Sequence, residues 1–261
     1  MALRLMTWNV HGMRGRDGRH DPERVAQVLT EARVDIAGLQ EVGALGRAGE
    51  LLDPGGTLEQ LTGLAAAYGL TQMRGGFPYG NCILARHPIT ATRTYDLSVP
   101  RREPRGCLRA DIEVPGGAIH FFNVHLGLQW RERRRQAAQL LSADILRDAA
   151  LRYPLVLVGD FNSPWARLSV VPRWIGRHLR DGAILGGAAG PTFPSRHPVL
   201  RLDRAFVGPA IRVVGAEVIT SVTARLASDH LPIVIEIELA AEARKPPPAR
   251  DLQAAGVATA R

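Results

Sequence analysis

The chain has 261 residues, of which 46% are hydrophobic and 22% charged, and this composition excludes a mostly disordered protein. The length permits one large domain or two small ones, and no repeat of fixed period is present, so we expect a single domain. No apolar run reaches the roughly eighteen residues that a membrane-spanning helix needs, and the N-terminus lacks the apolar core of a secretory leader.

The formal net charge is +8 and the isoelectric point is near 10.6, which favours polyanionic partners such as nucleic acid, anionic lipid or a phosphorylated substrate. Lys245 is the only lysine, so arginine supplies almost all of this basicity, and a compositional bias of the genome explains the charge equally well. The only cysteines, Cys82 and Cys107, lie in apolar stretches that predict buried free thiols and a reducing compartment. We therefore expect a cytoplasmic protein, and we expect it to be monomeric.

Strand patterns and helical patterns alternate along the chain. The strand patterns lie at residues 3–9, 35–40, 81–86, 107–114, 118–126, 155–160, 201–207 and 231–239. A first helix is expected where Asp21 can act as N-cap before Pro22. Two further helices are expected over 57–68, with Thr57 as cap, and over about 130–150. This order indicates an α/β domain over residues 1–240 with packed sheets and outer helices, followed by a flexible tail over 241–261 that contains three consecutive prolines.

Polar side chains gather where five of the predicted strands end, and strand ends are where layered α/β folds carry ligands and catalytic groups. These side chains are Asn9; Gln40 and Glu41; Asn123 and His125; Asp160 and Asn162; and Ser228, Asp229 and His230. The carboxylates and carboxamides form an all-oxygen set that suits Mg²⁺, or Mn²⁺ in its place, and no Cys/His cluster has the spacing of a zinc site. Two histidines could handle the protons of phosphate-ester hydrolysis.

Six short motifs occur in a familiar order: "TWNVHG", "LQEV", "NVHLGL", "GDFNSP", "RLDRAFV" and "SDHLPI". In this order the chain resembles the endonuclease/exonuclease/phosphatase superfamily with the deoxyribonuclease I-like fold, over residues 3–239. The resemblance implies a four-layer α/β sandwich in which two mainly antiparallel sheets are flanked by helices. It also implies a Mg²⁺-dependent phosphoesterase that acts on nucleic acids, phosphoinositides, sphingomyelin or other phosphodiesters.

The resemblance also implies roles for individual residues. Glu41 would be the principal metal ligand, with Asn9, Asp160 and Asp229 beside it. His230 would be the general base, with Asp203 fixing its tautomer, although the base is Asp160 in an alternative assignment that stays open. The second catalytic histidine would be His125, and a phosphate oxygen would bind Asn162.

Further phosphate contacts are expected at Asn123, Arg105 and Arg133. Arg133 belongs to a cluster at the start of a predicted helix, where the helix dipole disfavours cations, so either a nearby anion or a solvated charged face explains it. The loop over 190–200 could contribute substrate contacts through Phe193 and Arg196.

Three functions are compatible with these residues. The favoured one is a Mg²⁺-dependent phosphodiesterase whose substrate is nucleic acid or a phospholipid-type diester. The segment "NVHLGL" resembles the deoxyribonuclease I, sphingomyelinase and inositol-phosphatase side of the superfamily and not exonuclease III, so we expect a phosphodiester hydrolase ahead of a nuclease in particular. A phosphomonoesterase similar to inositol phosphatases would instead need a closed pocket with arginines around a terminal phosphate. A non-catalytic polyanion-binding module would bind without regard to chelators.

Overall fold

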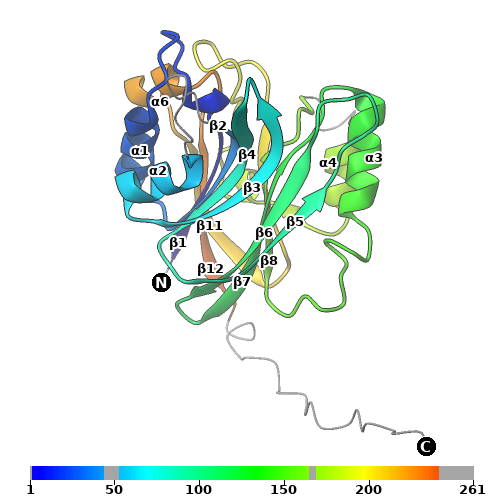
Figure 1. Ribbon diagram of the computed structural model, residues 1–261. Helices are drawn as coiled ribbons and strands as arrows, with labels where there is room; N and C mark the ends of the chain where they lie inside the picture. The colour runs from blue at the N-terminus through cyan, green and yellow to red at the C-terminus, as the bar shows by residue number, and fades with distance from the viewer. Residues whose placement is uncertain (1, 44–52, 165–168, 241–261) are drawn as a thin grey trace, which may run out of the picture.

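Two six-stranded sheets pack face to face, with helices on both outer faces (Figure 1). This arrangement is seen in the computed structural model of the chain, which describes residues 2–43, 53–164 and 169–240. It is the four-layer α/β sandwich expected from the sequence. The sheets are mixed, and most neighbouring strands run antiparallel.

The first sheet has the strand order β11-β12-β1-β2-β4-β3. Its central pair, β1 and β2, is parallel, so Asn9 at the end of β1 lies beside Gln40 of β2. The strands are β1 (Leu3–Asn9), β2 (Ile36–Gly43), β3 (Ala65–Arg74), β4 (Phe77–Ala85), β11 (Ile211–Val218) and β12 (Ile233–Leu239).

The second sheet has the order β5-β6-β7-β8-β10-β9. Its parallel pair, β7 and β8, places His125 opposite Asp160, and the antiparallel pair of β8 with β10 places Asp203 on the other side of Asp160. The strands are β5 (Ile89–Asp96), β6 (Gly106–Val114), β7 (Gly117–His125), β8 (Leu155–Asp160), β9 (Arg180–Asp181) and β10 (Asp203–Val207).

Helices cover the outer faces of the sheets, except for the short α5, which contacts strands of both sheets and places Ala183 in the core between them. In Figure 1, α1, α2 and α6 lie on the side of the first sheet, and α3 and α4 lie on the side of the second. Their bounds are α1 (Pro22–Glu31), α2 (Pro54–Thr62), α3 (Trp130–Leu140), α4 (Val170–Ile175), α5 (Gly182–Leu185) and α6 (Val222–Ala227), and a 3₁₀ turn spans His11–Met13.

Three apolar cores join these layers. The largest lies between the two sheets, where Ile235 of β12, Ile83 of β4 and Phe121 of β7 are all buried. A second core packs α1 and α6 against the first sheet, and a third packs α3 and α4 against the second. Both sheets are therefore covered on both faces, which holds the strand ends in a rigid frame.

Local signals placed the first helix correctly and misplaced the ends of the next two. Asp21 accepts a hydrogen bond from the backbone of Arg24 at 2.9 Å, as predicted for an N-cap. The predicted helix at 57–68 is instead α2: Asp53 caps it, and Gly63 in the left-handed conformation ends it before β3 begins. The predicted helix at 130–150 stops at Leu140, because the chain forms a local turn just after it. In this turn Ser142 Oγ accepts a hydrogen bond from the backbone N–H of Asp144.

All eight predicted strands are present, and the ones that were not predicted lie at sheet edges. These are β3 and β11 in the first sheet and β5 and β9 in the second. Cys82 and Cys107 are buried free thiols, as expected. Among the described residues, no helix has the length and apolarity to cross a membrane, and the predicted tail at 241–261 lies outside them.

Candidate active site

The predicted strand ends meet in one cleft with a volume of about 390 Å³. Both parallel strand pairs end here, so the side chains that follow β1, β2, β7 and β8 converge although they are far apart in sequence. The loop before β12 adds His230. The lining includes these predicted site residues: Glu41, Arg105, His125, Asp160, Asn162, Asp229 and His230.

Two carboxylates face each other across the centre of the cleft. The Nδ2 group of Asn9 donates hydrogen bonds to Glu41 Oε1 at 2.9 Å and to Asp160 Oδ2 at 3.1 Å. The same two oxygens lie 3.8 and 3.7 Å from His125 Nε2. Because one amide nitrogen reaches both oxygens, the two negative charges lie close together and require a positive partner.

Glu41 is held in an unusual backbone conformation. Its φ is +57°, a region that side chains other than glycine adopt at a cost of about 1–3 kcal/mol. Burial alone raises the pKa of Glu41, but the charge of His125 and hydrogen bonds from Tyr79 and Asn9 outweigh burial and hold this pKa at about 2. Because His125 is neutral, as its surroundings described below indicate, the two hydrogen bonds are what keep the pKa of Glu41 low. Glu41 is thus a carboxylate at neutral pH.

Asp160 and Asn162 follow the buried strand β8, with Phe161 between them. Both polar side chains face the cleft, and Phe161 turns into the core behind the second sheet. A left-handed turn at Asn162, with φ of +47°, produces this arrangement together with strand alternation. The Asn162 backbone N–H donates to Asp160 Oδ1 at 2.8 Å, and its Nδ2 group donates to the carbonyl of Leu126 at 2.9 Å.

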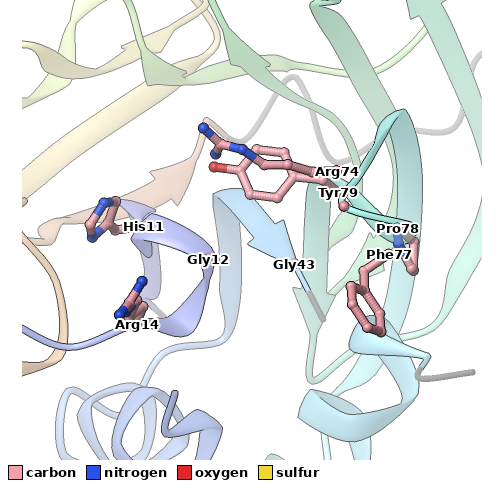
Figure 2. Close-up of a pocket in the computed structure, with 9 residues that line it drawn as sticks. His11, Gly12, Arg14, Gly43, Arg74, Phe77, Pro78 and Tyr79 are labelled. Atoms are coloured by element: carbon pink, nitrogen blue, oxygen red, sulfur yellow. The ribbon is translucent and has the colours of Figure 1, made fainter. Parts of the chain in front are cut away.

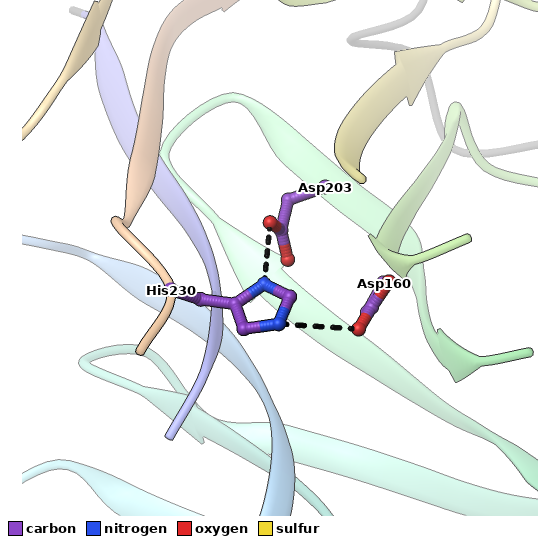
Figure 3. A group of neighbouring side chains, drawn as sticks. All are labelled: Asp160, Asp203 and His230. Carbon is purple, nitrogen blue, oxygen red and sulfur yellow. Dashed lines mark hydrogen bonds and ion pairs between the residues drawn. The ribbon is translucent and has the colours of Figure 1, made fainter. Parts of the chain in front are cut away.

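His230 forms a buried pair with Asp203 (Figure 3). The distance from Nδ1 to Asp203 Oδ2 is 2.9 Å, and Nε2 on the other side of the ring lies 3.8 Å from Asp160 Oδ2. Burial lowers the pKa of His230, but the charge and hydrogen bond of Asp203, followed by the charge of Asp160, raise this pKa to about 10. The imidazole of His230 therefore binds a proton tightly, and Nε2 is the ring nitrogen that faces the cleft.

Two neighbours fix the position of this pair. Thr192 Oγ1 donates to Asp203 Oδ2 at 2.5 Å, and Trp8 Nε1 donates to the carbonyl of His230 at 2.9 Å. The ring of Phe193 packs against His230 with 4.9 Å between centroids, so the loop over 190–200 does reach the cleft.

His125 differs from His230 because an arginine lies at its Nδ1 atom. Arg105 Nη1 is 3.4 Å away, and Arg105 in turn pairs with Glu103 at 2.9 Å. Burial and the charge of Arg105 lower the pKa of His125, so the ring is neutral. Because the Arg105 guanidinium can only donate, the lone pair of the neutral ring is assigned to Nδ1 and the proton to Nε2. The Nδ2 group of Asn162, 3.2 Å from Nε2, then donates to the carbonyl of Leu126 and not to the ring. His125 thus directs an N–H group toward Glu41 and Asp160.

The donor set suits a divalent cation bound by oxygen. Glu41 and Asp160 offer converging carboxylate oxygens, and burial raises the pKa of Asp160, which marks an incompletely compensated charge. Among the described residues, one set of three metal-type side chains has all its ligand atoms within 4.8 Å of one another: Asp160, Asp203 and His230. A cation there would compete with the bond between His230 and Asp203. We therefore favour Glu41 with Asp160, a pair that fits Mg²⁺, which commonly takes one or two carboxylates.

Asn9 and Asp229 surround this carboxylate pair in different ways. The Oδ1 atom of Asn9 accepts the backbone N–H of His11 at 3.0 Å, so the side chain presents its amino group to the carboxylates and holds them in place. Asp229 lines the cleft, with Oδ1 4.0 Å from His11 Nδ1.

Of the expected phosphate contacts, Asn123 is buried away from the cleft and Arg133 already binds a loop. Asn123 is fully buried, and its Nδ2 group donates to the carbonyls of Leu39 and Cys82. It lies on the same face of β7 as His125 but two residues deeper, so it joins the sheets and does not reach the cleft. Arg133 donates to the carbonyls of Gly127 and Leu128, so its guanidinium satisfies the loop that precedes α3.

Sequence reasoning missed Tyr79 and Arg74, both of which line the cleft. Tyr79 donates its hydroxyl to Glu41 Oε2, and the Arg74 guanidinium lies 4.9 Å from the centre of the Tyr79 ring. Neither residue lies in a motif. Tyr79 is on β4, next to the strand that carries Glu41, and Arg74 ends β3, one strand further from it.

The cleft continues into two further hollows. One, of about 560 Å³, meets it at His11, Arg74 and Tyr79 and has Phe77 and Pro78 on its far side (Figure 2). The other, of about 220 Å³, meets it at Glu103, Arg105 and Leu128 and carries Arg101 and Arg102. The carboxylate centre therefore adjoins open space through two different sets of residues.

Comparison with known proteins places these observations in a family. Residues 6–230 match the family model described as "Endonuclease/Exonuclease/phosphatase family". An uncharacterized Escherichia coli protein, YbhP, is 36% identical over 179 residues, which cover 66% of this chain and 68% of YbhP.

Solved structures share the fold. An endonuclease/exonuclease/phosphatase from Beutenbergia cavernae superposes with a TM-score of 0.78 at 27% identity, covering 92% of this chain and 72% of that one. A mannosyl-6-phosphatase from Bacteroides thetaiotaomicron superposes with a TM-score of 0.73 at 22% identity, covering 91% of this chain and all of that one.

Proposed function

Because this chain belongs to the endonuclease/exonuclease/phosphatase family, whose members hydrolyse phosphoester bonds, we propose that it is a Mg²⁺-dependent phosphodiesterase. One observation carries the proposal: the paired carboxylates Glu41 and Asp160 and the proton-accepting pair His230 and Asp203 share a single buried centre. The first pair suits a cation, and the second suits deprotonation of water. Both are needed for metal-assisted hydrolysis of a phosphate ester.

The proposed roles follow from the atoms that face the cleft. Bound Mg²⁺, for which Mn²⁺ could substitute, would supply positive charge to a phosphoryl oxygen; Glu41 and Asp160 would hold it, with Asp229 on the same side. Water attacks phosphorus, the bond to the leaving oxygen breaks and leaves its electron pair on that oxygen, and the proton released from water passes to Nε2 of His230 in its neutral form. Burial lowers the pKa of His230, but without a cation the charges of Asp203, Asp160 and Asp229 raise this pKa to about 10, so Nε2 already carries a proton. A cation held by Asp160 and Asp229 would offset two of these charges and free Nε2 to accept the proton of water, either directly or after Asp160.

His125 and Asn162 would act on the phosphate itself. Neutral His125 donates from Nε2, which suits stabilisation of charge on a phosphoryl or leaving oxygen and does not suit removal of a proton. The Asn162 amide lies 3.2 Å from that nitrogen, close enough for both groups to contact one phosphate.

The hollows beside the centre favour a diester. A diester carries a substituent on each side of phosphorus, and this cleft opens through two separate sets of residues. Five arginines line these hollows, as suits a nucleic acid or an anionic lipid headgroup: Arg14, Arg74, Arg101, Arg102 and Arg105. A phosphomonoesterase is the alternative, and Arg105, buried beside His125, is the group that would bind a terminal phosphate.

The test compares three substrates: bis(p-nitrophenyl) phosphate, supercoiled plasmid and p-nitrophenyl phosphate. Each is assayed with Mg²⁺ and with EDTA, and H230A is the control for contaminating activity. We expect Mg²⁺-dependent cleavage of the diesters that H230A lacks. Faster cleavage of the monoester would favour a phosphomonoesterase. Plasmid binding that is unchanged by EDTA, without turnover of any substrate, would indicate a non-catalytic polyanion-binding module.

A further inference from the structure

Tyr79 occupies a slot that Gly43 provides. It lies at the start of β4, opposite Gly43 of β2, and its side chain is only 6% exposed. A Cβ atom on Gly43 would lie 2.6 Å from Tyr79 Cδ2, closer than side chains tolerate, and Gly12 lies under the same ring with φ of +67°. The ring of Tyr79 therefore fits directly beside Glu41, which lies in the same strand as Gly43.

The hydroxyl of Tyr79 is aimed at one atom. It donates to Glu41 Oε2, and Asn9 donates to the other oxygen, Oε1, at 2.9 Å. Glu41, whose backbone adopts the left-handed conformation, therefore accepts a hydrogen bond at each of its two carboxylate oxygens. The outer face of the ring is covered by the Arg74 guanidinium at 4.9 Å, which limits rotation of Tyr79 (Figure 2).

We propose that Tyr79 is a positioning residue that orients the Glu41 carboxylate for cation binding. Hydrogen-bonding partners of metal ligands commonly change metal affinity by about 10- to 100-fold when removed, because the ligand then loses its orientation. Tyr79 also forms the wall between the central cleft and the hollow lined by Phe77 and Pro78. A substrate group in that hollow would press on the same ring that holds Glu41. The proposal rests on the proposed function only in taking Glu41 as a cation ligand.

The experiment uses Y79F, which keeps the ring in its slot and removes only the hydroxyl. The matched control is Y68F on the neighbouring strand β3, where the lost hydroxyl donates to the carbonyl of Val42 at 3.0 Å and faces no carboxylate. Mg²⁺ affinity of the substrate-free protein is measured by isothermal titration calorimetry, and circular dichroism checks the fold. We expect about 10-fold weaker Mg²⁺ binding in Y79F and wild-type binding in Y68F.

A second variant, G43A, keeps the hydroxyl but displaces the ring, and it should also weaken Mg²⁺ binding. Equal affinities for wild type and Y79F would overturn the role of Tyr79, as would an equal loss in Y68F, which would mark a general effect on stability. If the wild-type protein binds no Mg²⁺ and no Mn²⁺, the proposed function fails instead. The two failures are therefore distinct.

Discussion

Asp203 and Asp160 stand directly opposite each other on the antiparallel strands β10 and β8, and the ring of His230 bridges them. Residues paired in this way point to the same face of a sheet. The two carboxylates nevertheless have different partners: Asp203 accepts from His230 Nδ1 and Thr192, whereas Asp160 faces Glu41 and the cleft. Neighbouring strands thus place a carboxylate that orients the histidine next to one that we propose as a cation ligand.

The first prediction concerns Asp203. In D203N the partner of Nδ1 is neutral, so His230 loses its fixed tautomer and its stabilised charge, and kcat should fall by about 10²- to 10⁴-fold. Because Asp203 acts through His230, the double variant D203N/H230A should be no slower than H230A. Turnover of bis(p-nitrophenyl) phosphate measures both. Losses that multiply in the double variant would show that Asp203 acts independently of the histidine.

The sequence predicted which types of residue gather at the cleft better than how far each residue lies from it. Glu41, Asp160 and His230 lie in short motifs at strand ends, so residue type and local pattern were sufficient to find them. Asn123 lies in such a motif too, but only the pairing of β7 with β8 reveals that it stands opposite Val158, two residues below the cleft. Tyr79 could not be found from sequence, because its role depends on the register between β4 and β2.

The fold was predicted where strands have a buried face and missed at the edges. Ile233, Ile235 and Ile237 of β12 alternate because one side of this strand contacts the core between the sheets. In β5, by contrast, six of the eight residues are exposed, so an apolar pattern is absent and only hydrogen bonding to β6 defines the strand. Edge strands of this kind carry little sequence signal.

The second prediction concerns metal removal. A cation that binds the folded state alone adds about 2.7 kcal/mol of stability at a concentration 100 times its Kd, which corresponds to a rise in Tm of roughly 5–10 °C for a domain of this size. We expect EDTA to remove this rise and E41Q to show little of it. Differential scanning calorimetry with and without Mg²⁺ is the measurement. A wild-type Tm that does not change when Mg²⁺ is added would argue against a cation at Glu41.

The third prediction concerns the arginine that follows Asp203 in sequence. Arg204 is 1% exposed; it pairs with Asp181 at 3.5 Å and donates to the carbonyl of Ser163 at 3.0 Å. Removing one partner of a buried pair costs about 3–5 kcal/mol, so R204A should be strongly destabilised in urea unfolding. The control R212A breaks an exposed pair with Glu238 and should cost less than about 1 kcal/mol. Similar midpoints for the two variants would show that burial does not matter here.

The fourth prediction concerns His120, which is buried at the start of the strand pairing between β7 and β8. Its Nδ1 atom lies 2.6 Å from Asp111, and its Nε2 atom accepts the backbone N–H of Arg152 at 2.9 Å. Burial lowers the pKa of His120 below its ordinary value of 6.5, more than Asp111 raises it.

The unfolded chain therefore takes up a proton at this histidine before the folded one does. The stability that neutral His120 contributes is present above pH 6.5 and is lost as the pH falls from 6.5 toward the lower folded-state pKa. We expect the free energy of unfolding of H120Q, measured in urea at several pH values, to fall less over this interval than that of wild type. H197Q, at an exposed position, should follow the wild-type curve. If H120Q loses stability as steeply as wild type, the acid sensitivity belongs to other buried groups such as His125, whose pKa is also lowered.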